Sequence, residues 1–169
     1  MAARSLSRLD RSGATAIEVA LLLPLFLMIV LGGLDIGLWL LQSARLSEAA
    51  RRAARAAVIT APVASLSDQG TVSCRRVSGI TCSGGSIIAP DSFDRIERAA
   101  DMALADGSMI VTYRLLPDGS SNSKHPIVVI DIKNATHTLI FMHIIPGIGR
   151  TITLATATAS GSLPRKAYR

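Results

Sequence analysis

The stretch RSGATAIEVALLLPLFLMIV, from Arg11 to Val30, determines how the first part of this chain folds. It opens an apolar run that continues to Leu41 and is interrupted only by Asp35. A helix rises about 1.5 Å per residue, so residues 19–41 are enough to cross a hydrocarbon core of about 30 Å. We therefore predict a membrane-spanning helix, which Pro24 should loosen or kink in its first two turns.

A carboxylate stands at the head of this run, at Glu18. A charge of this kind weakens membrane insertion by about 2.5–3.5 kcal/mol at the bilayer centre and by less near its edge. A residue with that cost is a candidate functional residue. The alternative is that Glu18 only lies among the cytoplasmic headgroups.

Asp35 and Trp39 mark the other end of the span. The uninterrupted apolar part, Val19 to Leu34, is shorter than a typical spanning segment. Asp35 must therefore lie near the outer interface or find a partner. Trp39 fits the same position, because Trp favours the boundary between membrane and water.

Helical periodicity continues beyond the apolar run, in the Ala-rich residues 43–58 (SARLSEAARRAARAAV). We predict one continuous helix from about Ala14 to Ile59, amphipathic in its second half and ended by Pro62. The apolar stripe of this second half consists of Leu46, Ala49, Ala50, Ala53 and Ala57.

The length and composition of the chain leave room for only a small domain after the helix. The chain has 169 residues, a formal charge of +6, and one Trp, two Tyr and three Phe. It can hold an anchor and one modest domain. The positive charge raises nucleic acid as a partner. The basic residues are dispersed, however, and no aromatics interleave with them to stack bases, so no nucleic-acid partner is expected.

The pattern of the C-terminal part predicts a small domain with a short helix and a sheet. Residues 65–90, rich in Ser, Gly and Pro, predict a loop. The short helix should have Asp91 as its N-cap and Gly107 as its C-terminal stop. Alternation predicts strands over residues 108–116, 127–133, 138–145 and 151–159. The predicted fold is α+β, with a three- to four-stranded, mainly antiparallel sheet that the amphipathic half of the long helix covers on one face.

Cys74 and Cys82 lie close together in the predicted loop. Their spacing differs from the CxxC of redox and zinc sites. A structural disulfide is expected, contributing about 2–3 kcal/mol on the chain-entropy model. Such a bond persists in an oxidising compartment such as a bacterial periplasm. Two unrelated free thiols are the alternative.

No pattern for catalysis is found in the sequence. It contains no GxSxG, HExxH or phosphate-binding loop. The three histidines, His125, His137 and His143, lack metal-ligand spacing, and His137 and His143 are expected to be partly buried strand residues. Asp91, Asp94 and Glu97 suit the dipole of a helix N-terminus. We expect no enzyme, with no catalytic residue, no metal and no cofactor.

Positive charge alone does not orient the predicted span. Basic residues precede it (Arg4, Arg8, Arg11) and also come after it (Arg45, Arg51, Arg52, Arg55). The cysteine pair favours a cytoplasmic N-terminus and a periplasmic C-terminal domain. A cleaved secretory signal is an alternative, although the apolar run is long for one and Gln42 occupies the −3 position of the nearest cleavage site.

Residues 13–18 (GATAIE) have the form of a type IV prepilin cleavage site, in which a cut after Gly leaves Glu as the fifth residue of the mature chain. The wider stretch, residues 11–58, resembles the N-terminal region of TadE-like minor pseudopilins of tight-adherence (Tad, Flp-pilus) systems. The shared features are GATAIEVALLLP, GGLDIG and SEAARRAARAA. Val19 departs from the usual Phe, and Ala53-Ala54-Arg55 from the usual Gly-Ala-Arg. Weaker similarity is found in MIVTYRLL and IIPGIGRTITLATATAS.

The resemblance implies that a prepilin peptidase cuts between Gly13 and Ala14. The chain would then comprise a leader (1–13), the N-terminal helix (14–59, spanning to about residue 41) and a periplasmic α+β domain (60–169). In type IV-like pilins the new amino terminus is a cation, and the fifth residue can pair with it within one chain or between adjacent subunits. Here Ala14 would lie about one helical turn from Glu18.

The resemblance also implies a function and partners. The protein would be a single-pass inner-membrane minor pseudopilin of a bacterium, acting in pilus initiation or in a tip complex and able to enter the pilus. Its partners would be the prepilin peptidase, other minor pseudopilins, the major pilin, an inner-membrane assembly platform and membrane lipid. The alternative is a single-pass membrane-anchored periplasmic enzyme or binding domain unrelated to pili.

The first prediction is that the mature chain begins at Ala14. A prepilin peptidase keeps the helix and removes the leader, signal peptidase would cut near Ala44, and a plain anchor would keep Met1 or Ala2. Intact-mass analysis of protein from the native host distinguishes these outcomes. A strain without the prepilin peptidase is the control, and there the leader should remain. A start near Ala44, or an uncut leader in the native host, contradicts the prediction.

Overall fold

The computed structural model describes residues 6–65, 70–100, 107–117 and 124–163. The chain divides into two compact units. The first contains the chain up to Leu40 together with Thr138–Arg150, and the second contains Leu41–His137 and the chain from Thr151. Residues 138–150 therefore pack with the apolar part of the N-terminal helix, although they lie more than 90 residues later in the sequence.

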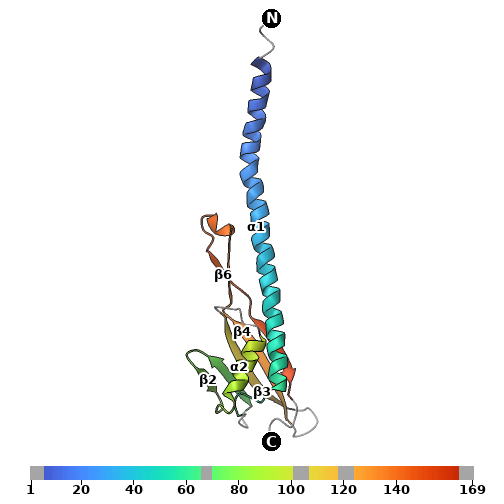
Figure 1. Ribbon diagram of the computed structural model, residues 1–169, viewed down its shortest axis with the longest axis vertical. Coiled ribbons are helices and arrows are strands. Elements are labelled where there is room, and N and C mark those ends of the chain that lie inside the picture. Colours follow the sequence, from blue (N-terminus) through green and yellow to red (C-terminus); the bar gives the residue numbers. More distant parts are fainter. Residues whose placement is uncertain (1–5, 66–69, 101–106, 118–123, 164–169) are drawn as a thin grey trace. The chain divides into compact units, whose positions relative to one another are not determined.

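A single helix, α1 (Leu6–Ile59), forms the N-terminal part of the chain (Figure 1). It begins at Leu6, before the predicted start at Ala14. A single glycine such as Gly13 weakens a helix by only about 1 kcal/mol, so it does not end the helix there. It ends at Ile59 as predicted, where the amide and hydroxyl groups of Thr60 both donate to the Ala56 carbonyl. Pro24 lies inside α1 and does not end it.

The apolar part of α1 is long and apolar enough to cross a membrane. From Thr15 onward it is the one such helix in the described ranges, and its most apolar 18-residue window has a mean hydropathy of 2.5. No part of that window is buried by protein. A helix that is apolar all round and uncovered is compatible with a single-pass membrane anchor.

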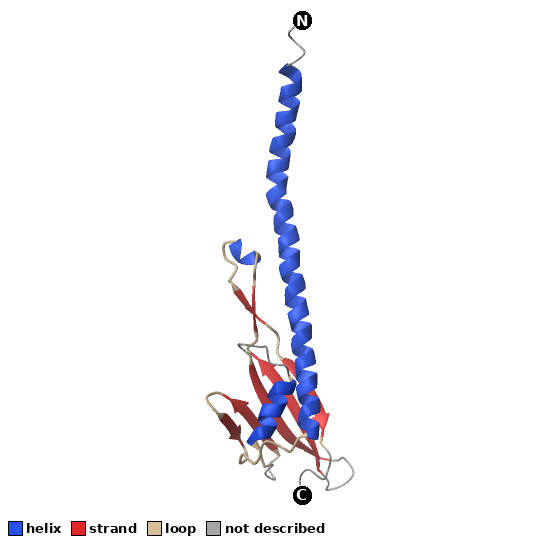
Figure 2. Cartoon of the chain, viewed as in Figure 1, coloured by secondary structure: helices blue, strands red, loops and turns tan. Residues whose placement is uncertain are grey.

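A five-stranded antiparallel sheet forms the centre of the second unit (Figure 2). Its strand order is β2-β1-β3-β4-β7. The strands are β1 (Thr71–Arg76), β2 (Ile80–Ser83), β3 (Ser108–Pro117), β4 (Lys124–Lys133) and β7 (Ala157–Ser162). Two shorter strands, β5 (Thr136–Thr138) and β6 (Thr151–Thr153), form a separate pair. The α+β class is confirmed, with more strands than predicted.

Both helices of the second unit cover the same face of this sheet. The predicted stripe of α1 is buried in full, and so are Phe93, Ile96 and Ala100 in and just after α2 (Pro90–Ala99). They face the buried positions of the strands, which align across the sheet as Val72, Tyr113 and Val128, and as Cys74, Val111 and Ile130. This apolar layer is the core of the unit.

One glycine permits the closest approach between α1 and the sheet. Gly161 lies opposite Val128 on β4, and a Cβ there would come within 2.5 Å of Cγ2 of Val58. The sheet can therefore reach the helix only with a residue that has no side chain at this point.

Tyr113 supports the core with one polar contact. Its buried hydroxyl oxygen accepts a hydrogen bond of 3.2 Å from the amide of Val63. Burial raises the pKa of the Tyr113 hydroxyl above its ordinary value of 10.0, and the hydrogen bond from Val63 lowers it in part. The side chain is therefore neutral at physiological pH.

Three secondary-structure predictions are wrong. The predicted loop over residues 65–90 contains the β1–β2 hairpin, whose strands bury only Val72 and Cys74 and so lack an apolar alternation. The predicted strand 138–145 holds only the end of β5, followed by a 3-10 turn, η1 (Met142–Ile144). The predicted strand 151–159 is divided into β6, which pairs with β5, and β7, which pairs with β4.

The short helix α2 also begins differently from the prediction. Its N-cap is Ala89 rather than Asp91, because Pro90 occupies the first helical position, where its missing amide costs nothing. Asp91 lies in the first turn, where a carboxylate suits the helix dipole. The helix ends at Ala99, before the predicted stop at Gly107, and residues 101–106 lie outside the described residues.

The second prediction concerns Cys74 and Cys82, which are register partners on β1 and β2 and are joined by a disulfide. Because Cys74 is fully buried, even a free thiol would be protected in the folded protein. Protein from membranes should therefore be denatured without reductant and then alkylated, and it should take up no label at either cysteine. Replacing both by Ala should lower the free energy of unfolding by about 2–3 kcal/mol. Labelling of both without reductant would contradict the periplasmic disulfide.

Candidate functional site

The predicted processing residues lie on α1. Gly13 and Ala14 have helical backbone, and Glu18 lies about one turn after Ala14 with an exposed side chain. The described residues around Glu18 are apolar and exposed, among them Ile17 at 64% and Leu21 at 73%. Cleavage after Gly13 and pairing of Glu18 with an amino terminus stay predictions.

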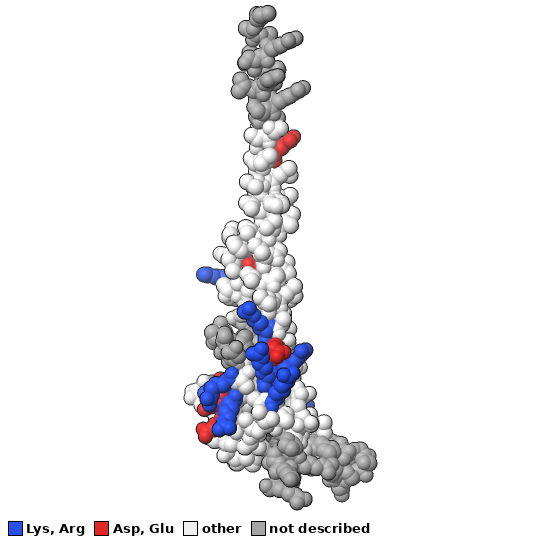
Figure 3. Space-filling model, turned by 45° about the vertical axis from the view of Figure 1, so that its right-hand side comes forward, with Lys and Arg blue, Asp and Glu red and all other residues white. Residues whose placement is uncertain are grey.

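The charged side chains of α1 are distributed unequally along its length. On the face shown in Figure 3, Lys and Arg gather over the C-terminal part of α1 and the sheet domain, while the apolar part is almost free of them. The exposed arginines of that C-terminal part include Arg45, Arg51, Arg52 and Arg55. An exposed ion pair of 3.4 Å joins Arg52 to Glu48 one turn earlier.

Asp35 is fully buried inside the first unit. Its Oδ1 accepts a hydrogen bond from the Ile140 amide at 3.1 Å, and its Oδ2 accepts from the amides of Phe141 at 2.8 Å and Met142 at 2.6 Å. The carboxylate therefore binds three consecutive backbone N–H groups from a segment 105–107 residues away in the sequence.

These three amides lie at the start of the 3-10 turn η1, whose own N-cap residue, Phe141, makes no side-chain capping bond. The first amides of a helical turn have no partner within the turn and carry a partial positive charge. A carboxylate that accepts from them forms charge-assisted hydrogen bonds, which are shorter and stronger than neutral ones. Asp35 thus caps η1 from another segment of the chain. The sequence predicts that Asp35 needs an interface or a partner, but not that the partner is this loop.

An apolar groove of about 410 Å³ lies beside this contact in the same unit. Residues 141–146 line one side of it. The other side consists of residues from the apolar run of α1, namely Pro24, Leu27, Met28, Leu31 and Gly32. The loop thus lies along the same part of α1 that is predicted to span a membrane.

A second polar contact joins the long helix to β5 within the sheet-containing unit. Gln42 Oε1 pairs with His137 Nδ1, and Gln42 Nε2 donates to the Thr136 carbonyl at 3.5 Å. His137 is buried on β5, as expected, whereas His143 is exposed on η1, so its expected place on a buried strand is wrong. His125 is a residue of β4.

The helix α2 is attached to the hairpin by an ion-pair cluster that the sequence does not predict. Arg76 of β1 pairs with Asp94 and lies 3.4 Å from Glu97, and its guanidinium lies 5.4 Å from the centre of the Phe93 ring. Asp94 and Glu97 therefore bind Arg76, in addition to any effect of the helix dipole.

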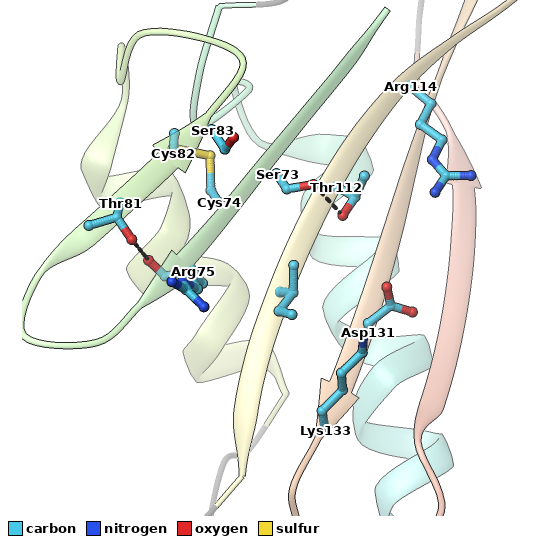
Figure 4. Close-up of a pocket in the computed structure, with 11 residues that line it drawn as sticks. Ser73, Cys74, Arg75, Thr81, Cys82, Ser83, Thr112, Arg114, Asp131 and Lys133 are labelled. Carbon is cyan, nitrogen blue, oxygen red and sulfur yellow. Dashed lines mark hydrogen bonds between the residues drawn. A yellow bond between two sulfur atoms is a disulfide. The ribbon is translucent and has the colours of Figure 1, made fainter.

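The face of the sheet opposite the helices is open and polar (Figure 4). It holds a shallow hollow of about 500 Å³, where the hydroxyls of Ser73 and Thr112 share a hydrogen bond of 3.1 Å. Its charged residues are Arg75, Arg114, Asp131 and Lys133. The hollow has no paired nucleophile and base, and in the described part of the chain no group of three or more His, Cys, Asp or Glu side chains could hold a metal.

Comparison with known proteins gives a match for the N-terminal segment. Residues 13–55 match the TadE-like protein family. The resemblance predicted from the sequence is thus confirmed, and the matched TadE-like segment includes Glu18, Asp35 and the groove residues of α1. No curated protein and no solved structure matched the chain.

The match supports a protein associated with Tad pili. The family is a pilus-associated structural component rather than a known enzyme class. It is also membrane-associated or pilus-associated, and the one apolar helix of the described residues is compatible with that location.

The third prediction concerns Asp35. Changing Asp35 to Ala removes the acceptor of three amides, and each buried amide left unpaired costs about 1–3 kcal/mol. The loop should therefore separate from α1, and exchange at the amides of residues 140–142 should become at least tenfold faster. Hydrogen exchange read by mass spectrometry measures this. The control is Asp131→Ala on the open sheet face, which should leave these amides protected. Unchanged protection in the Asp35 variant would contradict the capping role.

Proposed function

We propose that the protein is a minor pseudopilin of a Tad/Flp-type pilus system, processed by a prepilin peptidase and active in pilus initiation or in a tip complex. The TadE-like match over residues 13–55 carries the proposal. The GATAIE pattern supports it, because a Gly is followed five residues later by a Glu at the start of the apolar helix, as in a prepilin cleavage site.

The surface of α1 suits assembly with other helices. Glu18 is exposed on an otherwise apolar helix surface, so its carboxylate can reach the amino terminus of its own chain or of an adjacent subunit. In a dry bundle of helices a charge is tolerated only when it has a partner. Pairing with a processed amino terminus would supply that partner and would also set the axial position of one subunit against the next.

The function implies a set of partners. The prepilin peptidase would act on the Gly13–Ala14 bond at the cytoplasmic side of the inner membrane. Other minor pseudopilins, the major pilin and the inner-membrane assembly platform would contact the apolar part of α1. The disulfide between Cys74 and Cys82 suits a periplasmic position of the sheet domain, because such bonds persist in that compartment.

The open sheet face favours one alternative, a membrane-anchored binding domain. Its three basic side chains and one carboxylate surround a shallow hollow of about 500 Å³, which could accept an acidic ligand. In that case the helix would serve only as an anchor, and changes to Glu18 would leave the activity of the protein intact.

The fourth prediction separates the two functions. Glu18→Ala should insert into the membrane as well as the native chain or better, because a cost of insertion is removed. Surface piliation, and recovery of partner subunits with the protein, should fall severely. Glu18→Gln should behave like the Ala variant, since it keeps the shape of the side chain and loses the charge.

The matched control is Glu48→Ala on the same helix. It removes only the exposed pair with Arg52, which contributes about 0.3–0.5 kcal/mol, and piliation should persist. Piliation is measured by counting surface filaments, and insertion by resistance to alkaline extraction. Normal piliation in both Glu18 variants would reduce Glu18 to an interfacial residue and support the binding-domain alternative.

A further inference from the structure

We propose that residues 139–149 form a second membrane contact, an apolar loop that enters the outer leaflet beside α1 and holds a phospholipid acyl chain in the groove between them. The proposal rests on the membrane anchoring of α1 that is part of the proposed function. It adds a lipid-binding surface formed by a segment outside the TadE-like match.

The composition of this segment suits a lipid environment. It has the sequence LIFMHIIPGIG, without Asp, Glu, Lys or Arg. Two of its large apolar side chains are open to the surroundings, Ile140 at 50% and Ile144 at 72% exposure. A loop on a water-exposed domain is ordinarily polar, so an apolar loop with its isoleucines outward indicates an apolar surrounding.

The position of the groove indicates that the apolar surrounding of the loop is the membrane. The loop lines the groove together with α1 residues between Pro24 and Gly32, which belong to the predicted span. Met28 lies about 10 Å along the helix axis from Asp35. With Asp35 near the outer boundary of the hydrocarbon, the groove therefore extends from about 5 Å deep at Gly32 to about 16 Å deep at Pro24, roughly the depth of one leaflet. A groove with apolar walls at that depth is filled by an acyl chain.

Non-helical backbone is tolerated in the hydrocarbon region only where its polar groups are paired within the protein. The loop meets this condition at seven of its amides. Asp35 accepts from three of them. Four donate to carbonyls within residues 139–150, namely Leu139 to Arg150, Ile144 to Phe141, Ile145 to Met142 and Ile148 to Ile145.

The tip of the loop is a tight turn with its own amide bonded. Ile148 donates to Ile145 at 3.1 Å across Pro146 and Gly147, and Gly147 has a φ of +93°. Pro followed by a residue with positive φ is the pattern of a type II turn, which requires Gly at that place. The turn pairs the Ile148 amide with the Ile145 carbonyl, and Pro146 has no amide to satisfy, which reduces the number of backbone donors that the tip exposes to lipid.

Two residues limit the depth of insertion. His143 is exposed on η1, and Arg150 is exposed directly after the loop. A basic residue near the surface is attracted to anionic headgroups by about 1 kcal/mol. Arg150 therefore belongs at the headgroups, and the exposed polar ring of His143 disfavours deeper insertion of η1.

The fifth prediction tests this contact in the full mature chain, from Ala14, reconstituted in vesicles of phosphatidylethanolamine and phosphatidylglycerol. The two native cysteines form a disulfide, so one introduced cysteine can carry a bimane fluorophore. Ile144→Cys reports the loop, Leu23→Cys reports the apolar part of α1, and Thr158→Cys reports the sheet domain. All three positions are exposed, so the label should not disturb packing. Quenching by nitroxide-labelled lipid and by aqueous iodide is measured at each.

The label at Ile144 should be quenched by nitroxide lipid nearly as strongly as the label at Leu23, and by iodide several-fold less than the label at Thr158. Adding Asp35→Ala should lower the quenching of the Ile144 label by nitroxide lipid and raise its quenching by iodide, because the released loop leaves the leaflet. Strong iodide quenching at Ile144 while Leu23 stays in lipid overturns the proposal and leaves the anchor intact. Protection of Ile144 from both quenchers also overturns it, because protein, such as a second subunit, then covers the loop. Iodide quenching at Leu23 shows that the anchoring itself is wrong, and the lipid contact falls with it.

Discussion

The carboxylate of Asp35 is the one charge that the apolar part of the long helix must accommodate inside the protein. An isolated carboxylate would be costly there, and it becomes tolerable because three backbone amides of residues 140–142 donate to it. The same bonds cap a 3-10 turn that has no side-chain cap of its own. One contact thus solves two problems. It stabilises a buried carboxylate, and it holds an apolar loop along the helix.

The two parts of the long helix lie in different environments. Its apolar part is exposed except on the side that contacts residues 140–146, and this exposure suits lipid or the apolar helices of other subunits. Its second part is one-sided, with small residues such as Ala50 and Ala53 against the sheet and arginines outside. Small side chains on the helix allow it to pack closely on the sheet, and Gly161 on the sheet allows the same close approach because it has no side chain. The second part of the helix and the sheet therefore form one folded unit, and the apolar part remains available for assembly.

Much of the fold could be predicted because its signals are local. The apolar run, the Ala-rich stripe and Pro62 predicted the long helix and its end at Ile59. Alternation predicted the central strands near residues 108–116 and 127–133, and two nearby cysteines predicted the disulfide. In the candidate site, the pattern from Gly13 to Glu18 marked candidate processing residues, and their roles stay predictions because they would depend on a peptidase and partner subunits outside this chain.

The remainder depended on contacts between segments distant in the sequence. The partner of Asp35 lies 105–107 residues away, and no periodicity indicates it. The apolar residues 138–145 are equally suitable for a strand, and they form a capped turn because their amides bind a carboxylate rather than a neighbouring strand. Likewise, β1 depends on pairing with the distant β3, and β2 pairs with β1, to which the disulfide joins it. The sequence by itself determined the helix, its two kinds of surface and the central strands, because each depends on the spacing of neighbouring residues. Only the tertiary structure decided the environment of Asp35 and the place of the loop, because hydrogen bonds between distant segments depend on where the folded chain brings their donors and acceptors.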